Sequence, residues 1–200
     1  TRAGGRRNLL LYALATLALV AAMTLAWARD RALPRAEIAA RVAAEQQLNT
    51  LRARAEAGGD AESWATYADA LSQAGDASGA VEAFARASAL APRRADLAAA
   101  EGEARLLAAR NSGAAIPAEA RAAFARALAI DLRHPRARFF TAALHMAEGN
   151  PRAALDGWLA LLADTPRGSP EARELRASIE AVAQRTGIDV SARLAQIDAG

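Results

Sequence analysis

A pattern that occurs in two distant parts of the sequence constrains the fold of this chain more than any other feature. One segment reads AGDASGAVEAFARASALAP (74–92), and the other reads EGNPRAALDGWLALLADTP (148–166). They share four landmarks at one constant offset: Gly75 with Gly149, Ala80 with Ala154, Phe84 with Trp158, and Pro92 with Pro166. Glycine and proline mark turns, and residues four apart share one face of a helix. The echo therefore indicates a helical element that the chain builds more than once.

A third copy lies between these two. The stretch IPAEARAAFARALAIDL places Ala120 four positions before Phe124, with the same spacing. A helix-turn-helix unit of about 34 residues with an A-x3-F pattern is typical of the tetratricopeptide repeat (TPR). The step from Ala120 to Ala154 matches that period, whereas the step from Ala80 to Ala120 is longer by six positions. The full offset thus corresponds to two repeats and a six-residue insertion, which we place in a loop at RNSGAAIP (110–117).

The repeats predict an all-α fold, a TPR α-solenoid of about three repeats. Alanine-rich, arginine-rich sequence with 4% aromatic residues also favours helix. In repeat 1 we expect helix A at about 61–74, the turn Gly75-Asp76, and helix B at about 77–91. The expected domains are a linker and leading helix (29–59), the TPR domain (60–167, with repeats at about 61–94, 95–134 and 135–167), and a C-terminal capping helix and tail (168–200). Because the A-helix signature is only partly met, another alanine-rich helical bundle is the alternative.

The N-terminal segment predicts a membrane span. Residues 9–28, LLLYALATLALVAAMTLAWA, hold no charge and would reach roughly 30 Å as a helix, the thickness of a bilayer core. We therefore expect an N-terminal transmembrane helix after a basic flank at residues 1–8, with the lipid bilayer as a partner. The alternative is a cleaved signal peptide, because Ala26-Trp27-Ala28 has the form of a cleavage site. Arginines on both sides of the run leave its orientation open.

Charge and residue types exclude several functions. The 25 basic residues, all arginine, exceed the 22 acidic ones only through Arg2, Arg6 and Arg7. Nucleic-acid binders need a clustered positive surface, so we expect no nucleic-acid partner. The sequence has no cysteine, no glycine-rich phosphate loop after a strand, and no grouping with metal-ligand spacing. It predicts no enzyme, no cofactor and no metal site, although an axial haem ligand from His134 or His145 is left open.

What remains is a surface that could bind a peptide. TPR helices stack around a groove lined by the A helices, and solenoids bind extended or helical segments there. Repeat phase predicts as groove residues Ala65, Asp69 and Ser72 from repeat 1, Ala99, Glu103 and Leu106 from repeat 2, and Phe139, Ala143 and Met146 from repeat 3. Methionine and aromatic side chains suit adaptable binding of a helical partner. The alternative for Phe139 and Phe140 is packing in the core.

Several motifs together resemble the cytochrome c-type biogenesis proteins of the CcmI/CycH kind and their single-span relatives in nitrite reductase maturation. The motifs are the A-x-x-x-x-Q-Q-L-x-x-L helix, the segment GGDAESWATYADALSQAGD, and the run ARAAFARALAIDLRHPRARFFTAALHMAEGNPRAALDGWLALLAD. The resemblance covers roughly residues 45–185. The best-known members carry two spans, whereas this sequence shows one.

The resemblance implies a membrane-anchored periplasmic TPR chaperone of cytochrome c maturation, single-pass in the bacterial inner membrane. Such a protein binds the C-terminal helix of apocytochrome c and presents it to the membrane subunits of the haem-ligation complex, without chemistry of its own. The family supplies no residue-level site, so the groove residues come from repeat phase alone. The alternative function is a TPR scaffold for another cell-envelope assembly process.

Overall fold

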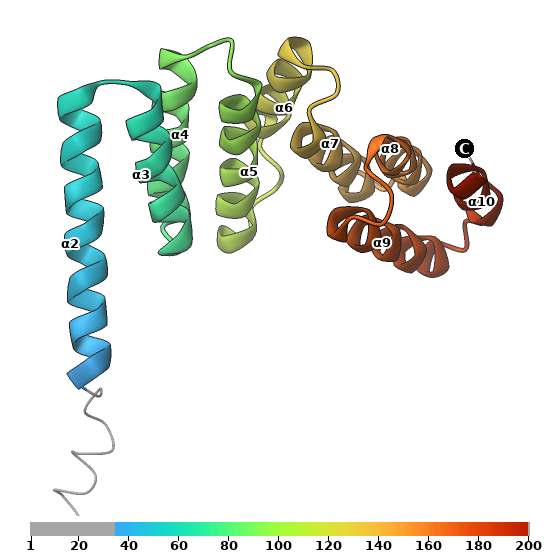
Figure 1. Cartoon of the computed structure of the whole chain (residues 1–200), viewed down its shortest axis with the longest axis horizontal. Helices are drawn as coiled ribbons and strands as arrows, with labels where there is room; N and C mark the ends of the chain where they lie inside the picture. Colours follow the sequence, from blue (N-terminus) through green and yellow to red (C-terminus); the bar gives the residue numbers. More distant parts are fainter. Residues whose placement is uncertain (1–34, 200) are drawn as a thin grey trace, which may run out of the picture. The chain divides into compact units, whose positions relative to one another are not determined.

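The computed structural model describes residues 35–199, and these residues divide after Gln47 into two units. The described part is all helical, as the repeats predict, and Figure 1 shows its helices. In chain order they are α2 (Arg35–Gly58), α3 (Ala61–Gln73), α4 (Ala77–Leu90), α5 (Ala95–Ser112), α6 (Ala118–Ile130), α7 (Pro135–Ala147), α8 (Pro151–Asp164), α9 (Pro170–Thr186) and α10 (Ser191–Ala199).

The expectation of a transmembrane helix requires correction. Among residues 35–199, every helix is too short or too polar to cross a bilayer. Residues 9–28, on which the expected span and the alternative signal peptide both rest, lie outside the described residues. Over the described residues the fold class is therefore a TPR-like α-solenoid without a transmembrane helix. The inner-membrane localisation and the lipid-bilayer partner, which depended on that helix, are withdrawn with it.

Consecutive helices pack as pairs, α3 with α4, α5 with α6, and α7 with α8. Side chains at the helix starts fix the boundaries. Asp60 accepts a hydrogen bond from the backbone N–H of Ser63 at 2.8 Å, and Asn150 accepts one from Ala153 at 3.2 Å, so both begin their helices with a cap. Gly75 and Gly149, which correspond in the repeat pattern, turn the chain inside their pairs with φ of 82° and 77°. Glycine adopts this left-handed backbone without a steric penalty.

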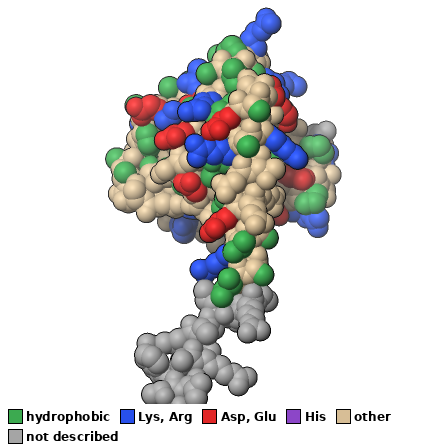
Figure 2. Space-filling view, turned by 90° about the vertical axis from the view of Figure 1, so that its left-hand side faces the viewer, with side chains coloured by type: hydrophobic (Ala, Val, Ile, Leu, Met, Phe, Trp, Pro, Cys, Tyr) green, Lys and Arg blue, Asp and Glu red, His purple; other side chains and the backbone are tan. Residues whose placement is uncertain are grey.

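The first turns of the second unit come from the end of α2. Leu48 and Ala55 lie on one face of the helix and pack against the core of α3 and α4, where Ala55 is fully buried. The solvent side of these turns carries charged side chains, with an ion pair between Arg52 and Glu56 at 2.9 Å. Figure 2 shows basic and acidic side chains interspersed on the face that it presents.

The A-x3-F positions form the centre of each pair, as their spacing predicts. Ala80, Ala120 and Ala154 are fully buried, and the aromatic residues that follow them are buried as well. The small residue permits a close approach of the paired helices, and the ring fills the space beyond it. Gly102 illustrates how close the approach is in repeat 2, because a Cβ atom there would lie 2.8 Å from two ring atoms of Phe124.

The six-residue insertion lengthens a helix more than a loop. Helix α5 has 18 residues, against 13 in α3, and continues through Ser112, where the sequence predicted a loop from residue 110. Gly113, at φ 69°, ends the helix, and its N–H bonds to the carbonyl groups of Ala109 and Arg110. The connection to α6 is therefore confined to residues 113–117.

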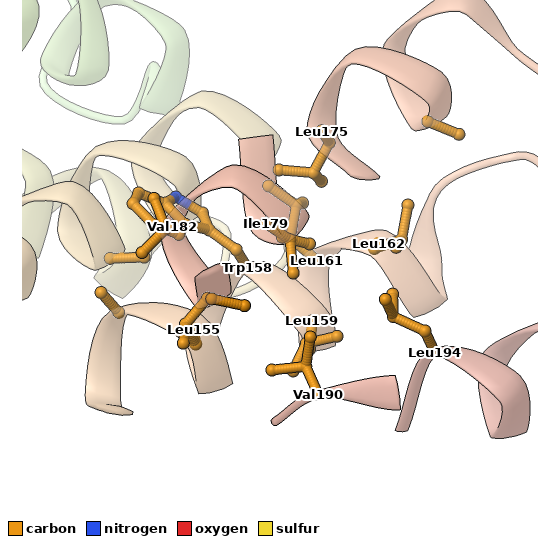
Figure 3. Packing of buried hydrophobic residues seen from close by; sticks show 14 residues of the cluster. Leu155, Trp158, Leu159, Leu161, Leu162, Leu175, Ile179, Val182, Val190 and Leu194 are labelled. Carbon is orange, nitrogen blue, oxygen red and sulfur yellow. The ribbon is translucent and has the colours of Figure 1, made fainter. Parts of the chain in front are cut away.

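Most of the buried branched aliphatic side chains gather in the C-terminal part, around α8 and α9 (Figure 3). Leu155, Leu159 and Ile179 are almost completely buried there. Helix α9 occupies the place expected for the capping helix and packs against α8. Helix α10 also packs against α8, through Leu194 and through an ion pair between Arg193 and Asp156. Most of the buried leucine, isoleucine and valine side chains thus surround the third repeat.

Candidate functional site

A hollow of about 650 Å³ lies where the start of α7, the end of α8 and the first half of α9 meet. Its apolar lining comes from all three helices and the adjoining turns: Pro135, Phe139, Leu161, Pro166 and Leu175. Its volume falls within the range of about 300–1,000 Å³ typical of ligand pockets. Helices α7 and α9 each pack against α8, so the hollow is the space that α8 leaves between them.

Phe139 is held firmly in the wall of this hollow. Its carbonyl oxygen accepts a hydrogen bond from the indole Nε1–H of Trp158 at 3.1 Å. Its ring lies 5.9 Å from the ring of Trp158 and packs edge-on against Phe140, with centroids 5.4 Å apart. The ring is half-buried, and the part that lines the hollow is a fixed apolar surface. Aromatic side chains held this way anchor many protein interfaces.

Two consecutive residues, His134 and Pro135, define the start of α7. The imidazole Nδ1 of His134 accepts a hydrogen bond from the backbone N–H of Ala137 at 3.3 Å, and Pro135 follows as the first helical residue. Proline suits that position because its missing N–H would have no partner within the helix. His134, left open as a haem ligand by the sequence, thus caps the helix that carries Phe139.

Charged side chains surround the apolar lining. Arg133, Arg136 and Arg138 come from the α7 side, and Asp164, Glu171 and Glu174 come from α8 and α9. Arg138, of which only 18% is exposed, donates to Asp164 at 2.7 Å and so joins α7 to the end of α8. Arg136 forms a longer ion pair with Glu103 of α5, at 3.4 Å.

The carboxyl group of Glu171 has a lowered pKa. A hydrogen bond from its own backbone N–H and one from the hydroxyl of Ser169 lower the pKa of its carboxyl group, and Arg173 adds a smaller effect in the same direction. Glu171 lies in the first turn of α9, where the positive end of the helix dipole also favours a carboxylate. This carboxylate on the acidic side of the hollow is therefore ionised at neutral pH.

Of the groove residues predicted from repeat phase, only Phe139 lines this hollow. Two of them belong to the core instead, since Ala65 and Ala99 are 7% and 0% exposed. Both face their neighbouring helices because the A helices of repeats 1 and 2 are packed on more than one side, which a phase taken from the repeat pattern does not reveal.

The other predicted residues occupy varied places along the A helices. Asp69 is exposed, and the hydroxyl of Ser72 donates to the carbonyl of Ala68 in its own helix at 3.0 Å. Glu103 holds Arg136, as described above. Leu106 packs on the cluster between α5 and α7, whereas Ala143 and Met146 pack on the C-terminal cluster. Phe140 is half-buried and stacks on Phe124 at 5.3 Å, as the core alternative expected.

Sequence reasoning missed a buried carboxylate in α5. Glu101 is 5% exposed and accepts hydrogen bonds from Arg105, at 2.9 Å and 3.0 Å, and from Arg126 of α6, at 2.6 Å. It stands where the repeat pattern has leucine, with arginine four positions later. An acidic residue at a core position followed by arginine at i+4 is the sequence signal that could have revealed it.

Residues 35–199 contain no group of three His, Asp or Glu side chains arranged to hold a metal ion. His145, the other candidate haem ligand, lies with its Nδ1 3.6 Å from a carboxylate oxygen of Glu148. This arrangement at the end of α7 offers a polar pair on a helix surface and no enclosed site.

Neither a family model nor a curated protein sequence matches this chain. Solved structures do resemble it. MamA has 13% identity and a TM-score of 0.59, over 80% of this chain and 88% of MamA. The type III secretion translocator chaperone SycD of Yersinia enterocolitica has 18% identity and a TM-score of 0.51, over 63% and 85%. PcrH, in complex with the chaperone binding region of PopD, has 23% identity and a TM-score of 0.51, over 62% and 92%. These likenesses show the fold, a TPR-like helical solenoid.

Proposed function

We propose that this chain is a peptide-binding chaperone of cytochrome c maturation that holds the C-terminal helix of an apocytochrome c and presents it to the haem-ligation complex. The observation that carries its binding role is the hollow between α7 and α9, with a fixed aromatic wall and a charged rim. An amphipathic helix buries its apolar face in a groove of this kind, and the groove contributes no chemical step.

Two of the structural neighbours support peptide binding in general. PcrH was solved with the chaperone binding region of PopD, and SycD was solved in complex with a peptide of the translocator YopD. Both are chaperones that share the helical solenoid of this chain at 23% and 19% identity. The same fold with an apolar hollow makes a protein segment the ligand class that we propose here.

The cytochrome-specific part of the proposal rests on the sequence resemblance. It depends on the run from ARAAFARALAIDL through HPRARFF to DGWLALLAD, which supplies α6, α7 and α8. That run also supplies about half of the residues that line the hollow, including Phe139 and Leu161. A TPR scaffold for another assembly process would use the same hollow for a different segment, so the identity of the ligand separates the two functions.

A calorimetric titration of the full chain with synthetic peptides tests the proposal. We expect C-terminal helix peptides of apocytochromes c to bind saturably and more tightly than unrelated amphipathic helices of equal length and charge. Equal binding of the unrelated helices would refute the cytochrome-specific role and favour a general scaffold. Absence of binding to every peptide would refute the peptide-binding role itself.

A blocking variant locates the binding. Ser178 lines the hollow, is exposed, and uses its hydroxyl to donate to the carbonyl of Glu174 in its own helix. Ser178→Trp should fill the hollow and weaken peptide binding at least about 10-fold, because the bound segment would have to displace the indole. Ala181→Trp, on an exposed position of the same helix outside the hollow, is the matched control. Equal affinity of both variants would place the binding elsewhere.

A further inference from the structure

The hollow is flanked by α7 on one side, called here the basic wall, and by α9 on the other, called the acidic wall, and these two walls carry opposite charge. Helix α7 and the turn before it supply Arg133 and Arg136, whereas α9 supplies Glu171 and Glu174. Both helices begin with a proline, at residues 135 and 170, so Arg136 and Glu171 are each the second residue of their helix. The charge reverses between corresponding positions of two helices that flank one apolar floor.

Part of this charge is free to interact with a ligand. Within residues 35–199, the guanidinium of Arg133 and the carboxylate of Glu174 have no ion-pair partner, and both residues are exposed. The side chain of Arg136 is 52% exposed and keeps a long pair with Glu103. Arg138 and Asp164 are tied closely to each other, at the α8 end. Arg133 on the basic wall and Glu174 on the acidic wall are therefore the two charges that remain available to a ligand.

From this arrangement, and resting on the proposed peptide-binding function, we infer that the hollow selects an amphipathic helix with an acidic flank on one side of its apolar stripe and a basic flank on the other. The apolar stripe contacts Phe139, Leu161 and Leu175, the acidic flank faces Arg133 and the basic flank faces Glu174. A helix with two acidic flanks would meet Glu171 and Glu174 with like charge, and a helix with two basic flanks would meet the arginines.

Three helical peptides with one apolar stripe and equal length test the inference on the full chain. One has an acidic and a basic flank, one has two acidic flanks, and one has two basic flanks. At about 50 mM salt we expect the mixed peptide to bind about 10-fold more tightly than either of the others, because a like-charge contact at a partly desolvated rim opposes binding. The preference should shrink at about 500 mM salt, where exposed charges are screened.

Charge reversal on one wall should change the preference in a defined direction. Arg133→Glu replaces the unpaired positive charge of the basic wall by a negative one, so the preference should shift toward the peptide with two basic flanks, and Glu174→Arg should shift it toward the peptide with two acidic flanks. Arg152→Glu and Glu180→Arg reverse exposed charges outside the hollow and are the matched controls. All four substitutions lie on exposed positions, so circular dichroism should show folded protein.

The outcomes separate this inference from the proposed function. Similar affinity of the three peptides, together with tight binding of an apocytochrome helix, overturns the charge rule and leaves the chaperone proposal standing. Preferences that the control variants change as much as Arg133→Glu and Glu174→Arg also overturn the rule. A full chain that binds none of the three peptides and no apocytochrome helix overturns both.

Discussion

Replacement of Gly102 by alanine tests how the second repeat is packed. A Cβ atom at this position would lie 2.8 Å from Cε1 and Cζ of Phe124 and 3.0 Å from Cδ1. An ordinary contact needs 3.4 Å or more, so the ring would have to retreat by about 0.6 Å, the difference between 3.4 Å and 2.8 Å. The ring is 1% exposed and stacks on Phe140 with centroids 5.3 Å apart, so neighbouring side chains oppose its retreat.

Two effects of opposite sign decide the result. Alanine is favoured over glycine inside a helix by about 1 kcal/mol. Insertion of a methyl group into a close-packed core costs about 1–3 kcal/mol. Because the methyl group meets three atoms of a ring that is itself held in place, we expect the upper part of that range. Gly102→Ala should therefore lower the free energy of unfolding by about 1–2 kcal/mol, the packing cost less the gain in helix propensity.

A double-mutant cycle measures the effect, with urea unfolding followed by circular dichroism. Phe124→Leu removes the ring atoms that the new methyl group would meet, so Gly102→Ala in that background should raise the free energy of unfolding by up to about 1 kcal/mol. Ala122→Gly, at an exposed position within α6, is the control that measures helix propensity alone in this protein. Stabilisation by Gly102→Ala in the native background would refute the packing argument.

Three further perturbations have defined outcomes. Glu101→Ala should lower the free energy of unfolding by about 1–3 kcal/mol in urea titrations, because it breaks the hydrogen bond from Arg126 that joins α5 to α6 and the bonds from Arg105 within α5, but leaves both arginines able to reach water. A change below about 0.5 kcal/mol would contradict this. Ser169→Ala should lower the free energy of unfolding by about 1 kcal/mol, because the Ser169 hydroxyl caps α9 by accepting a hydrogen bond from the N–H of Ala172 at 3.1 Å. Ser178→Ala, at an exposed position of the same helix, is the control and should be nearly neutral. Hydrogen bonds from Ser63 and Ser191 lower the pKa of Asp60 and Asp189 below the ordinary value of 3.8, so both carboxylates favour the folded state above about pH 4 and lose that contribution as the pH falls below it. The melting temperature should therefore fall between about pH 4 and pH 3, less steeply in Asp60→Asn, and an equal slope in that variant would exclude Asp60 as a source.

The fold was accessible from sequence because the repeat landmarks have direct steric roles. The left-handed turns inside the pairs favour glycine at positions 75 and 149, and the close approach of the paired helices requires a small residue at positions 80 and 154. The spacing of these residues therefore indicates where each pair lies. The insertion was harder to place. The sequence of residues 110–112 suggested a loop, but the preceding helix continues through them and ends at Gly113. Local propensity does not decide between a longer helix and a longer loop.

The site was less accessible than the fold. Repeat phase selected Phe139, which lines the hollow, but the hollow depends on α9, which lies outside the three repeats that the pattern defines. Leu175 and Glu174 belong to the capping segment, where no repeat signature assigns a phase. Ala65 of α3 and Ala99 of α5 were expected on the groove surface, but both are buried between helices. An alanine fits a groove surface and a tight helix contact equally well, so the sequence does not separate the two.

The concentration of large apolar residues around α8 and α9 has a consequence for biosynthesis. Chains leave the ribosome from the N-terminus at about 5–20 residues per second, and segments begin to fold as they emerge. Here the alanine-rich pairs emerge first, while Leu155, Leu159 and Ile179, which lie among the largest fully buried side chains, emerge near the end of the described chain. We expect the early helix pairs to remain loosely ordered on the ribosome. They should gain stable packing only when the leucine-rich section docks on them, so the part of the chain that is synthesised last would be the first to pack stably.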